Sequence, residues 1–382
     1  MRLLHRASPW RTLFADGAVP DRERLSTLLA PLCEAVDRLG PSPSLAELHA
    51  WQRELVDVLS RLELPAWRIS QLISDHNDAL YRRAIEASLA EMRGQGWGEP
   101  PVAFCVLTLG SAARHESLLA PDQDNAMIIA NYPDARHGEI DGFFQALGER
   151  FTERLDAAGI PLCRGHVMAR WPMWRKRLVE WQRQLEIWTA ERRVKRAQQA
   201  SILLDVAPVY GNADLAEALR AHVSALLPRA GLFVDELAAL LEETPAAAER
   251  FGRLVAARRD DRPHRRALDL KHQGLLPLVN AVRLLAWCHG VQSVETRSRL
   301  VELVASGALR ADRAEALQRA HGRMQALLLD AQRADLGMGR AAGDWIDLAT
   351  LDEAGYWLLR HDMRLVRRLG DFAASAARQG RR

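Results

Sequence analysis

The 382-residue chain is short of cysteine, of long apolar runs and of net charge. Its four cysteines are scattered and form no Cys-x-x-Cys pair, so neither a disulfide scaffold nor a zinc knuckle is expected. No apolar run approaches the roughly 18 residues of a membrane span. Residues 1–16 contain arginine and histidine where a signal peptide would have an apolar core. A formal net charge of +3 is too small to indicate a protein that coats nucleic acid. We therefore expect a cytoplasmic protein that does not enter the membrane.

Aromatic residues are also scarce, at 6% of the chain, yet eleven of them are tryptophan. The apolar content of 48% and the charged content of 26% are ordinary for a globular protein. At roughly 100–200 residues per domain, the length allows two or three domains and a sizeable core.

Hydrophobic patterning divides the chain into three zones. Before residue 94 the apolar residues recur at helical spacing, and Ser44 with Glu47 forms a capping-box pattern. Apolar runs of strand length follow, with helices between them, and from Ala213 onward we find helical periodicity and no convincing strand. The expected strands are Val102–Leu109, Ala126–Ala130 and Ile202–Ala207, and the expected helices include Leu25–Leu39, Pro65–Arg93, Phe143–Ala157, Met173–Gln199 and Ala246–Ala257.

These patterns predict an α/β (α+β) core with a small mixed sheet, flanked by an N-terminal helical segment and a C-terminal all-α bundle. The predicted domains are residues 1–66, the core at 67–212 and the helical domain at 213–382. Because the apolar runs are continuous, we expect strands that are covered on both faces.

A pair of aspartates, Asp122-x-Asp124, leads into the second predicted strand. By itself the pair means little, since about six acid-x-acid pairs are expected by chance in this composition. On an extended chain, however, residues i and i+2 point to the same side, so both carboxylates can face one cation. Mg²⁺ prefers one or two carboxylates together with substrate phosphates. The alternative is a solvated turn after Pro121.

The first predicted strand ends at Gly110-Ser111. Glycine permits close backbone approach, and the serine hydroxyl with adjacent N–H groups can bind phosphate oxygens; a plain strand-to-helix turn is the alternative. Arg114 is a candidate phosphate ligand, or else an ion-pair partner of Glu116 or an aspartate. Asp205 lies inside the apolar strand predicted at Ile202–Ala207, where it either pairs with a cation or completes a metal site.

The combination resembles the Gly-Ser…Asp-x-Asp signature of the DNA-polymerase-β-like nucleotidyltransferase superfamily. It is most similar to a nucleotidyltransferase family related to the PII-protein uridylyltransferases, whose members often carry CBS or cyclic-nucleotide-binding domains. The resemblance is collinear over about residues 66–365 and rests on these segments: Asp75-His76-Asn77-Asp78-Ala79-Leu80, Gly110-Ser111, Arg114-His115-Glu116, Asp122-Gln123-Asp124-Asn125-Ala126, Cys163-x-Gly165-x-x-Met168-Ala169, Leu203-Leu204-Asp205, and Leu268-Asp269-Leu270-Lys271.

The resemblance implies an enzyme that uses an NTP and Mg²⁺, with Mn²⁺ as the alternative cation. It implies that Asp205 serves with Asp122 and Asp124 as catalytic metal ligand and that Lys271 contacts the triphosphate; the alternative for Lys271 is a surface lysine. The acceptor would be a hydroxyl on a regulatory protein, and the nucleotide UMP or AMP.

The chain departs from the family pattern in three respects. Ala113 stands where the family usually has glycine, and Val206 follows Asp205 where the family has arginine. No CBS or cyclic-nucleotide domain is expected before the core, so such regulation is either lost or supplied by a partner chain.

The segment after Met173 combines a tryptophan stripe with many basic residues. Nucleic-acid stacking is one interpretation, but the heptad-like spacing of Trp174, Trp181 and Trp188 favours packing in a core. Cys163 is expected to be a small buried residue. We weigh three functions: a nucleotidyltransferase, a catalytically silent nucleotide-binding signalling module, and an RNA nucleotidyltransferase, which the low charge disfavours.

Overall fold

The computed structural model describes residues 34–35, 38–39, 42–119, 121–190, 203–227, 230–255, 263 and 266–379. Most of the helix predicted at Leu25–Leu39, the basic residues of 191–199, Ile202 and the last three residues lie outside these ranges. The chain forms two compact units, one of residues 1–185 with 202–223 and the other of residues 186–201 with 224–382. Within the described ranges, none of the helices combines the length and apolar character that a bilayer crossing requires.

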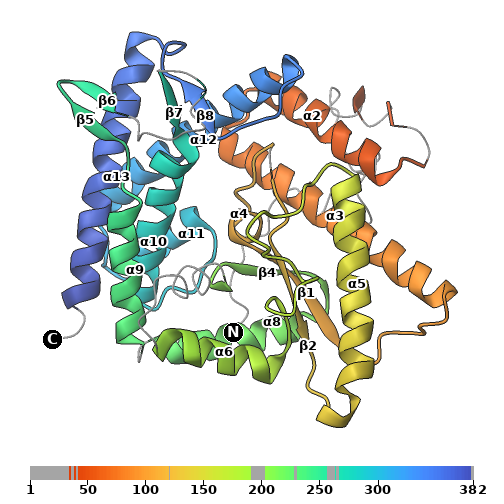
Figure 1. Ribbon diagram of the computed structural model, residues 1–382. Coiled ribbons are helices and arrows are strands. Elements are labelled where there is room, and N and C mark those ends of the chain that lie inside the picture. The colour runs from red at the N-terminus through yellow and green to blue at the C-terminus, as the bar shows by residue number, and fades with distance from the viewer. Residues whose placement is uncertain are drawn as a thin grey trace. The chain divides into compact units, whose positions relative to one another are not determined.

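A four-stranded sheet forms the centre of the first unit (Figure 1). Its strands are β1 (Phe104–Leu109), β2 (Asn125–Ile129), β3 (Arg175–Arg177) and β4 (Val206–Gly211), in the order β3-β2-β1-β4. Strand β1 runs antiparallel to β2 and β4, whereas β3 runs parallel to β2, so the sheet is mixed as predicted. Every residue of β1 and β2 is buried, which agrees with their continuous apolar sequence.

The observed β3 was predicted as the start of a long helix. Helix α6 instead begins at Leu178 and runs to Ala190. The Met127 N–H donates to the Trp174 carbonyl at 2.8 Å, and the buried Arg175 side chain pairs with Asp141 at 3.0 Å. These long-range contacts place Arg175–Arg177 against β2 and override the local helical pattern.

Strand β4 also differs from the prediction, because it starts at Val206 and extends past Pro208 to Gly211. Proline removes a backbone donor and is therefore confined to edge strands and irregular positions. Strand β4 lies at the edge of the sheet, and its register with β1 shifts between Val106 and Leu107, where Pro208 pairs with Leu107.

Helices surround this sheet within the first unit: α2 (Leu45–Arg61), α3 (Ala66–Gly94), the single turn α4 (Gly110–Ala113), α5 (His137–Ala157) and α8 (Ala213–Leu226). The Ser44 capping box is confirmed, with both reciprocal hydrogen bonds present. Tyr81 of α3 packs 6.4 Å from Phe151 of α5, and Phe104 of β1 packs 5.1 Å from Phe144, measured between ring centroids. The core of this unit therefore lies between the sheet and α3 with α5.

The second unit is dominated by helices α9 (Gly231–Glu243), α10 (Leu276–Cys288), α11 (Thr296–Ala305), α12 (Ala311–Gly337) and α13 (Glu353–Gln379), with a π-helical turn at Lys271–Leu275. The predicted mixed core with a helical C-terminal region is confirmed. The prediction that no strand follows Ala213 was wrong in detail. Strand β5 (Ala248–Arg250) pairs with β6 (Arg253–Val255), and β7 (Ala267–Asp269) pairs with β8 (Trp345–Asp347). The helix predicted at Ala246–Ala257 is replaced by the first hairpin, which turns at Phe251 and Gly252 with φ values of 49° and 73°.

Candidate active site

Asp122 and Asp124 lie directly before β2, at the end of the sheet where β1 finishes. Asp122 is exposed and Asp124 is partly buried. A carboxylate oxygen from each lies within 4.8 Å of the other and of the Cys163 sulfur. A Cβ added to Gly110, whose φ is +56°, would lie 3.7 Å from Asp124 Oδ2. The backbone at Gly110, where glycine was expected to permit a close approach, therefore lies next to the aspartate pair.

The residues that alternate with the aspartates fix this segment. The Gln123 side-chain amide, fully buried, donates to the carbonyls of Thr152 at 2.9 Å and Ile160 at 2.8 Å. Asn125, also fully buried, accepts the N–H of Ala169 at 2.8 Å through Oδ1. Because alternate residues of an extended chain point to opposite sides, these anchors direct Asp122 and Asp124 to the other side.

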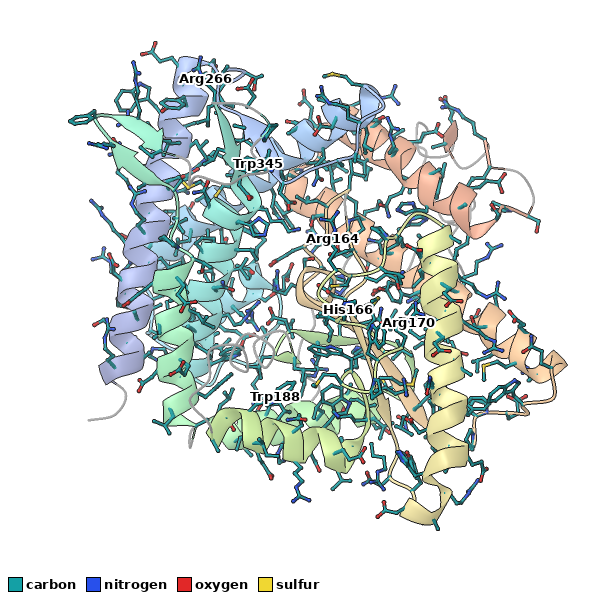
Figure 2. The ribbon with its side chains drawn as sticks, viewed as in Figure 1. Arg164, His166, Arg170, Trp188, Arg266 and Trp345 are labelled. Atoms are coloured by element: carbon teal, nitrogen blue, oxygen red, sulfur yellow. The ribbon has the colours of Figure 1, made fainter. Side chains whose placement is uncertain are left out.

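Cys163 is buried, as predicted, but it also contacts the acidic pair, which the sequence did not indicate. Burial, followed by the negative charge of Asp124, which also accepts a hydrogen bond from the thiol, raises the pKa of the Cys163 thiol to about 12. The thiol is thus protonated at neutral pH. The charged donors for a cation are therefore the two carboxylates, a set that fits a hard ion such as Mg²⁺. Arg164 and His166, which follow Cys163 in the sequence, are exposed and are labelled in Figure 2.

The turn after β1 continues from Gly110 through Ser111 and Ala113. Ser111 is exposed, and its carbonyl accepts the N–H of Glu116 at 2.8 Å. Ala113 is buried. It is not among the non-glycine residues of the described chain that have a positive φ. Alanine at this position therefore imposes no backbone strain on the turn.

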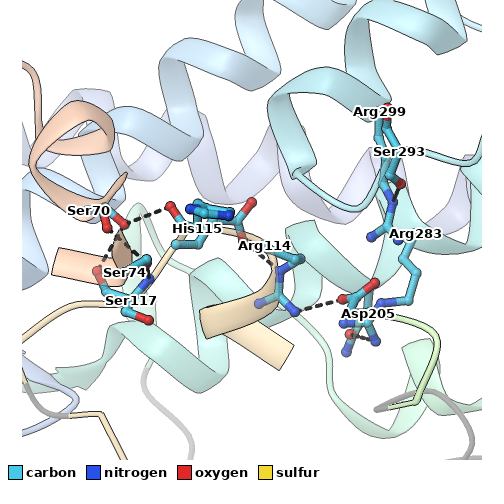
Figure 3. Close-up of polar contacts among 11 residues, drawn as sticks. Ser70, Ser74, Arg114, His115, Ser117, Asp205, Arg283, Ser293 and Arg299 are labelled. Atoms are coloured by element: carbon cyan, nitrogen blue, oxygen red, sulfur yellow. Dashed lines mark hydrogen bonds and ion pairs between the residues drawn. The ribbon is translucent and has the colours of Figure 1, made fainter. Parts of the chain in front are cut away.

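Arg114 forms a buried ion-pair network with two acids (Figure 3). Its Nε donates to Glu116 Oε2 and its Nη1 donates to Asp205 Oδ2, each at 2.7 Å. The three side chains are at most 7% exposed. Burial lowers the pKa of Arg114, but the charges of Glu116 and Asp205 outweigh it, so the pKa stands above its ordinary value. The pairing foreseen as the alternative for Arg114 is present with both acids.

Asp205 lies beside the end of β1, where its carbonyl accepts the Gly110 N–H at 3.0 Å. Its side chain, however, belongs to neither of the two clusters of metal-ligand type among the described residues. The roles of Asp205 as third ligand and of Arg114 at a phosphate stay predictions.

Helix α3 holds the residues that follow Arg114. The Ser70 hydroxyl donates to the carbonyls of His115 at 3.4 Å and Ser117 at 3.0 Å, and the Ser117 N–H donates to the Ser74 hydroxyl at 3.1 Å (Figure 3). This brings the Asp75–Leu80 segment, singled out in the sequence, against the turn after β1.

The pKa of the Tyr81 hydroxyl reflects its burial and the acidic residues around it. Burial raises the pKa of its hydroxyl, and the charges of Asp124, Asp78 and Asp122 raise it further. Asn125 donates to the same hydroxyl at 3.3 Å. Tyr81 therefore stays protonated between the α3 acid and the aspartate pair.

Lys271 belongs to the second unit, where its ammonium lies 3.3 Å from Asp344 Oδ1 and is partly exposed. Its contact with a triphosphate stays a prediction. Trp174 and Trp181 in the first unit are buried, and Trp181 Nε1 donates to the Met127 carbonyl at 3.0 Å, as the packing interpretation requires.

Comparison with known protein families gives two matches. Residues 50–195 match the model described as "Putative nucleotidyltransferase DUF294", and residues 231–377 match "Putative nucleotidyltransferase substrate binding domain". Together the matches span more than half of the chain. A search of curated proteins finds no match.

Proposed function

The chain belongs to this nucleotidyltransferase family, and from that premise we propose that it transfers a nucleoside monophosphate from an NTP to a hydroxyl acceptor. The observation that supports this most is the convergence of Asp122 and Asp124 beside the Gly110-Ser111 turn. It unites two carboxylate oxygen donors with a backbone that a phosphate can approach closely.

In this proposal, Asp122 and Asp124 hold Mg²⁺ as a pair of ions, with Mn²⁺ as a substitute. The bound cations would neutralise the phosphates and stabilise the attacking and leaving oxygens of an in-line displacement. The exposed Ser111 hydroxyl binds a phosphate oxygen. Cys163, protonated, donates to Asp124 and orients that carboxylate.

Asp205 enters the proposal through its contact with Arg114, which holds the start of β4 beside the end of β1. As a third ligand it would have to exchange the Arg114 guanidinium for a cation. The phosphates would likewise compete with Glu116 and Asp205 for Arg114.

The acceptor is proposed to be a hydroxyl, such as that of tyrosine, on a regulatory protein, and the nucleotide UMP or AMP, by the resemblance to PII-protein uridylyltransferases. The match of residues 231–377 to a substrate-binding domain supports a role of the second unit in holding that acceptor.

The test incubates the full chain with each α-labelled NTP and Mg²⁺ in a lysate of the source organism. We expect one protein band to acquire label with one nucleotide, and the double variant Asp122→Asn/Asp124→Asn to reduce labelling to background. Asp134→Asn is the matched control, because Asp134 is an 87% exposed aspartate paired with Arg177. Transfer that survives in the double variant would remove the metal assignment.

The second candidate, a catalytically silent nucleotide-binding module, is favoured by one observation, the engagement of Asp205 by Arg114. It predicts thermal stabilisation by NTP with Mg²⁺ and no pyrophosphate release with any acceptor. Label appearing in RNA instead of protein would identify the third candidate.

A further inference from the structure

We propose a second cation site, formed by Asp75, Asp78 and His115, that binds a divalent transition metal such as Zn²⁺ or Mn²⁺. One carboxylate oxygen from each aspartate and one imidazole nitrogen lie within 4.8 Å of one another. This cluster shares no residue with the Asp122–Asp124 pair, and the proposal does not depend on nucleotidyl transfer.

The burial of Asp75 is the first argument for a cation. Asp75 is 3% exposed, and its Oδ1 lies 3.2 Å from His115 Nδ1. Its Oδ2 is buried and accepts no hydrogen bond from the described chain. A buried carboxylate oxygen that lacks a donor is costly, and a coordinated cation removes that cost.

The second argument is that rigid elements bring the donors together. Asp75 and Asp78 are three residues apart on α3, so they share one face of that helix. His115 is carried to this face by the hydrogen bonds that Ser70 donates to the carbonyls of His115 and Ser117. His115 also has a left-handed backbone, with φ of 56°. Little ordering is therefore left for the metal to impose on the backbone.

The chemistry of the donors selects the kind of metal. One imidazole nitrogen with two carboxylates suits Zn²⁺ or Mn²⁺ better than Mg²⁺, which prefers oxygen and water. Metal–ligand distances of about 2.0–2.2 Å place ligand atoms about 3–4 Å apart. The three ligand atoms lie within 4.8 Å of one another, so the cluster needs to contract by no more than about 1–2 Å to reach that size.

Occupancy of this site would act on the turn after β1. His115 follows Arg114 directly, and the N–H of His115 donates to the Ala112 carbonyl at 3.0 Å within that turn. A metal on His115 would fix one side of the Gly110–Ser117 segment to α3, while Arg114 fixes the other side to Asp205. The segment would then be tied at both sides.

The experiment uses the metal-stripped full chain and Zn²⁺ alone, without nucleotide, because Mn²⁺ is also proposed to bind at Asp122 and Asp124. Isothermal titration counts the sites, and Co²⁺ substitution reports nitrogen ligation by its visible absorption. We expect the wild type and Asp122→Asn/Asp124→Asn to bind Zn²⁺ alike. His115→Ala and Asp75→Asn should each weaken Zn²⁺ binding by more than the roughly 10–100-fold that loss of a supporting residue causes.

His166→Ala is the matched control, because His166 is exposed, has a similar φ of 58° and lies outside the cluster. Melting temperatures of the metal-free variants establish that each is folded, and His115→Gln replaces His115→Ala if the alanine variant does not fold. Zn²⁺ binding that is unchanged in the folded His115 and Asp75 variants would overturn the proposal. So would a wild type that binds no Zn²⁺, or binding that is lost in Asp122→Asn/Asp124→Asn instead.

Discussion

The Arg114 network offers the sharpest test of how the site is held together. Arg114→Ala would remove the guanidinium that joins the carboxylates of Glu116 and Asp205, which are at most 7% exposed in the wild type. Removing one member of a buried ion pair costs about 3–5 kcal/mol, because it leaves uncompensated charge in the interior. We expect Arg114→Ala to lose free energy of unfolding in this range.

Arg114→Lys refines the expectation. The guanidinium reaches its two partners with different nitrogens, Nε for Glu116 and Nη1 for Asp205. A single ammonium keeps the charge but not this planar fork, so we expect an intermediate loss of about 1–3 kcal/mol. The matched control is Arg136→Ala, because the Arg136–Glu139 pair is exposed to solvent and its loss should leave stability nearly unchanged.

The assay is urea unfolding followed by tryptophan fluorescence and circular dichroism. Two transitions are fitted, because two compact units need not unfold as one two-state system. A loss below about 1 kcal/mol for Arg114→Ala would refute the reasoning.

Asp205→Asn separates the two roles considered for that acid. If Asp205 serves mainly Arg114, the variant loses about 1–3 kcal/mol of stability and binds Mg²⁺ as the wild type does. A large fall in Mg²⁺ affinity with little change in stability would show that Asp205 is a metal ligand.

Three further predictions concern the framework. Gly211→Ala should prevent folding, because Gly211 has φ of +88° and an added Cβ would lie 2.2 Å from the Phe104 carbonyl oxygen; yield and circular dichroism test this. Burial lowers the pKa of His49 below 6.5, so the folded state binds its proton less readily than the unfolded state. Stability from His49 is present above pH 6.5 and is lost as pH falls below it, and His49→Gln should flatten the melting temperature between about pH 7 and 5. Trp181→Phe should cost about 1–3 kcal/mol in urea unfolding, since Trp181 is fully buried and donates to Met127.

The Gly211 and Trp181 predictions each have a control variant in the same unit. Gly138→Ala should fold normally, because nothing lies within 4 Å of an added Cβ there. Trp171→Phe should change stability by less than about 0.5 kcal/mol, since Trp171 is 43% exposed. A wild-type melting temperature that does not fall on acidification would contradict the His49 argument.

Local patterns made part of this structure predictable. The Ser44 capping box needs residues only three apart, and β1 and β2 have apolar runs with clear boundaries. The common side of Asp122 and Asp124 follows from the two-residue period of an extended chain, and the structure adds how Gln123 anchors it.

What could not be predicted depends on distant partners. Strand β3 forms because Arg175 and its neighbours meet β2, although their local sequence favours a helix. The choice of Arg114 between phosphate and carboxylate depends on Asp205, 91 residues later. The closeness of His115 to Asp75 depends on how α3 packs, which no short window of sequence contains.

The order of the strands has a consequence for the synthesis of this chain. Strand β1 lies between β2 and β4, yet β4 begins about 100 residues after β1 ends. At about 5–20 residues per second, a ribosome needs roughly 5–20 seconds to deliver that partner. During this interval one edge of β1, whose residues are all buried in the folded protein, lacks its native neighbour, so the nascent chain is a natural client for chaperones that shield strand edges.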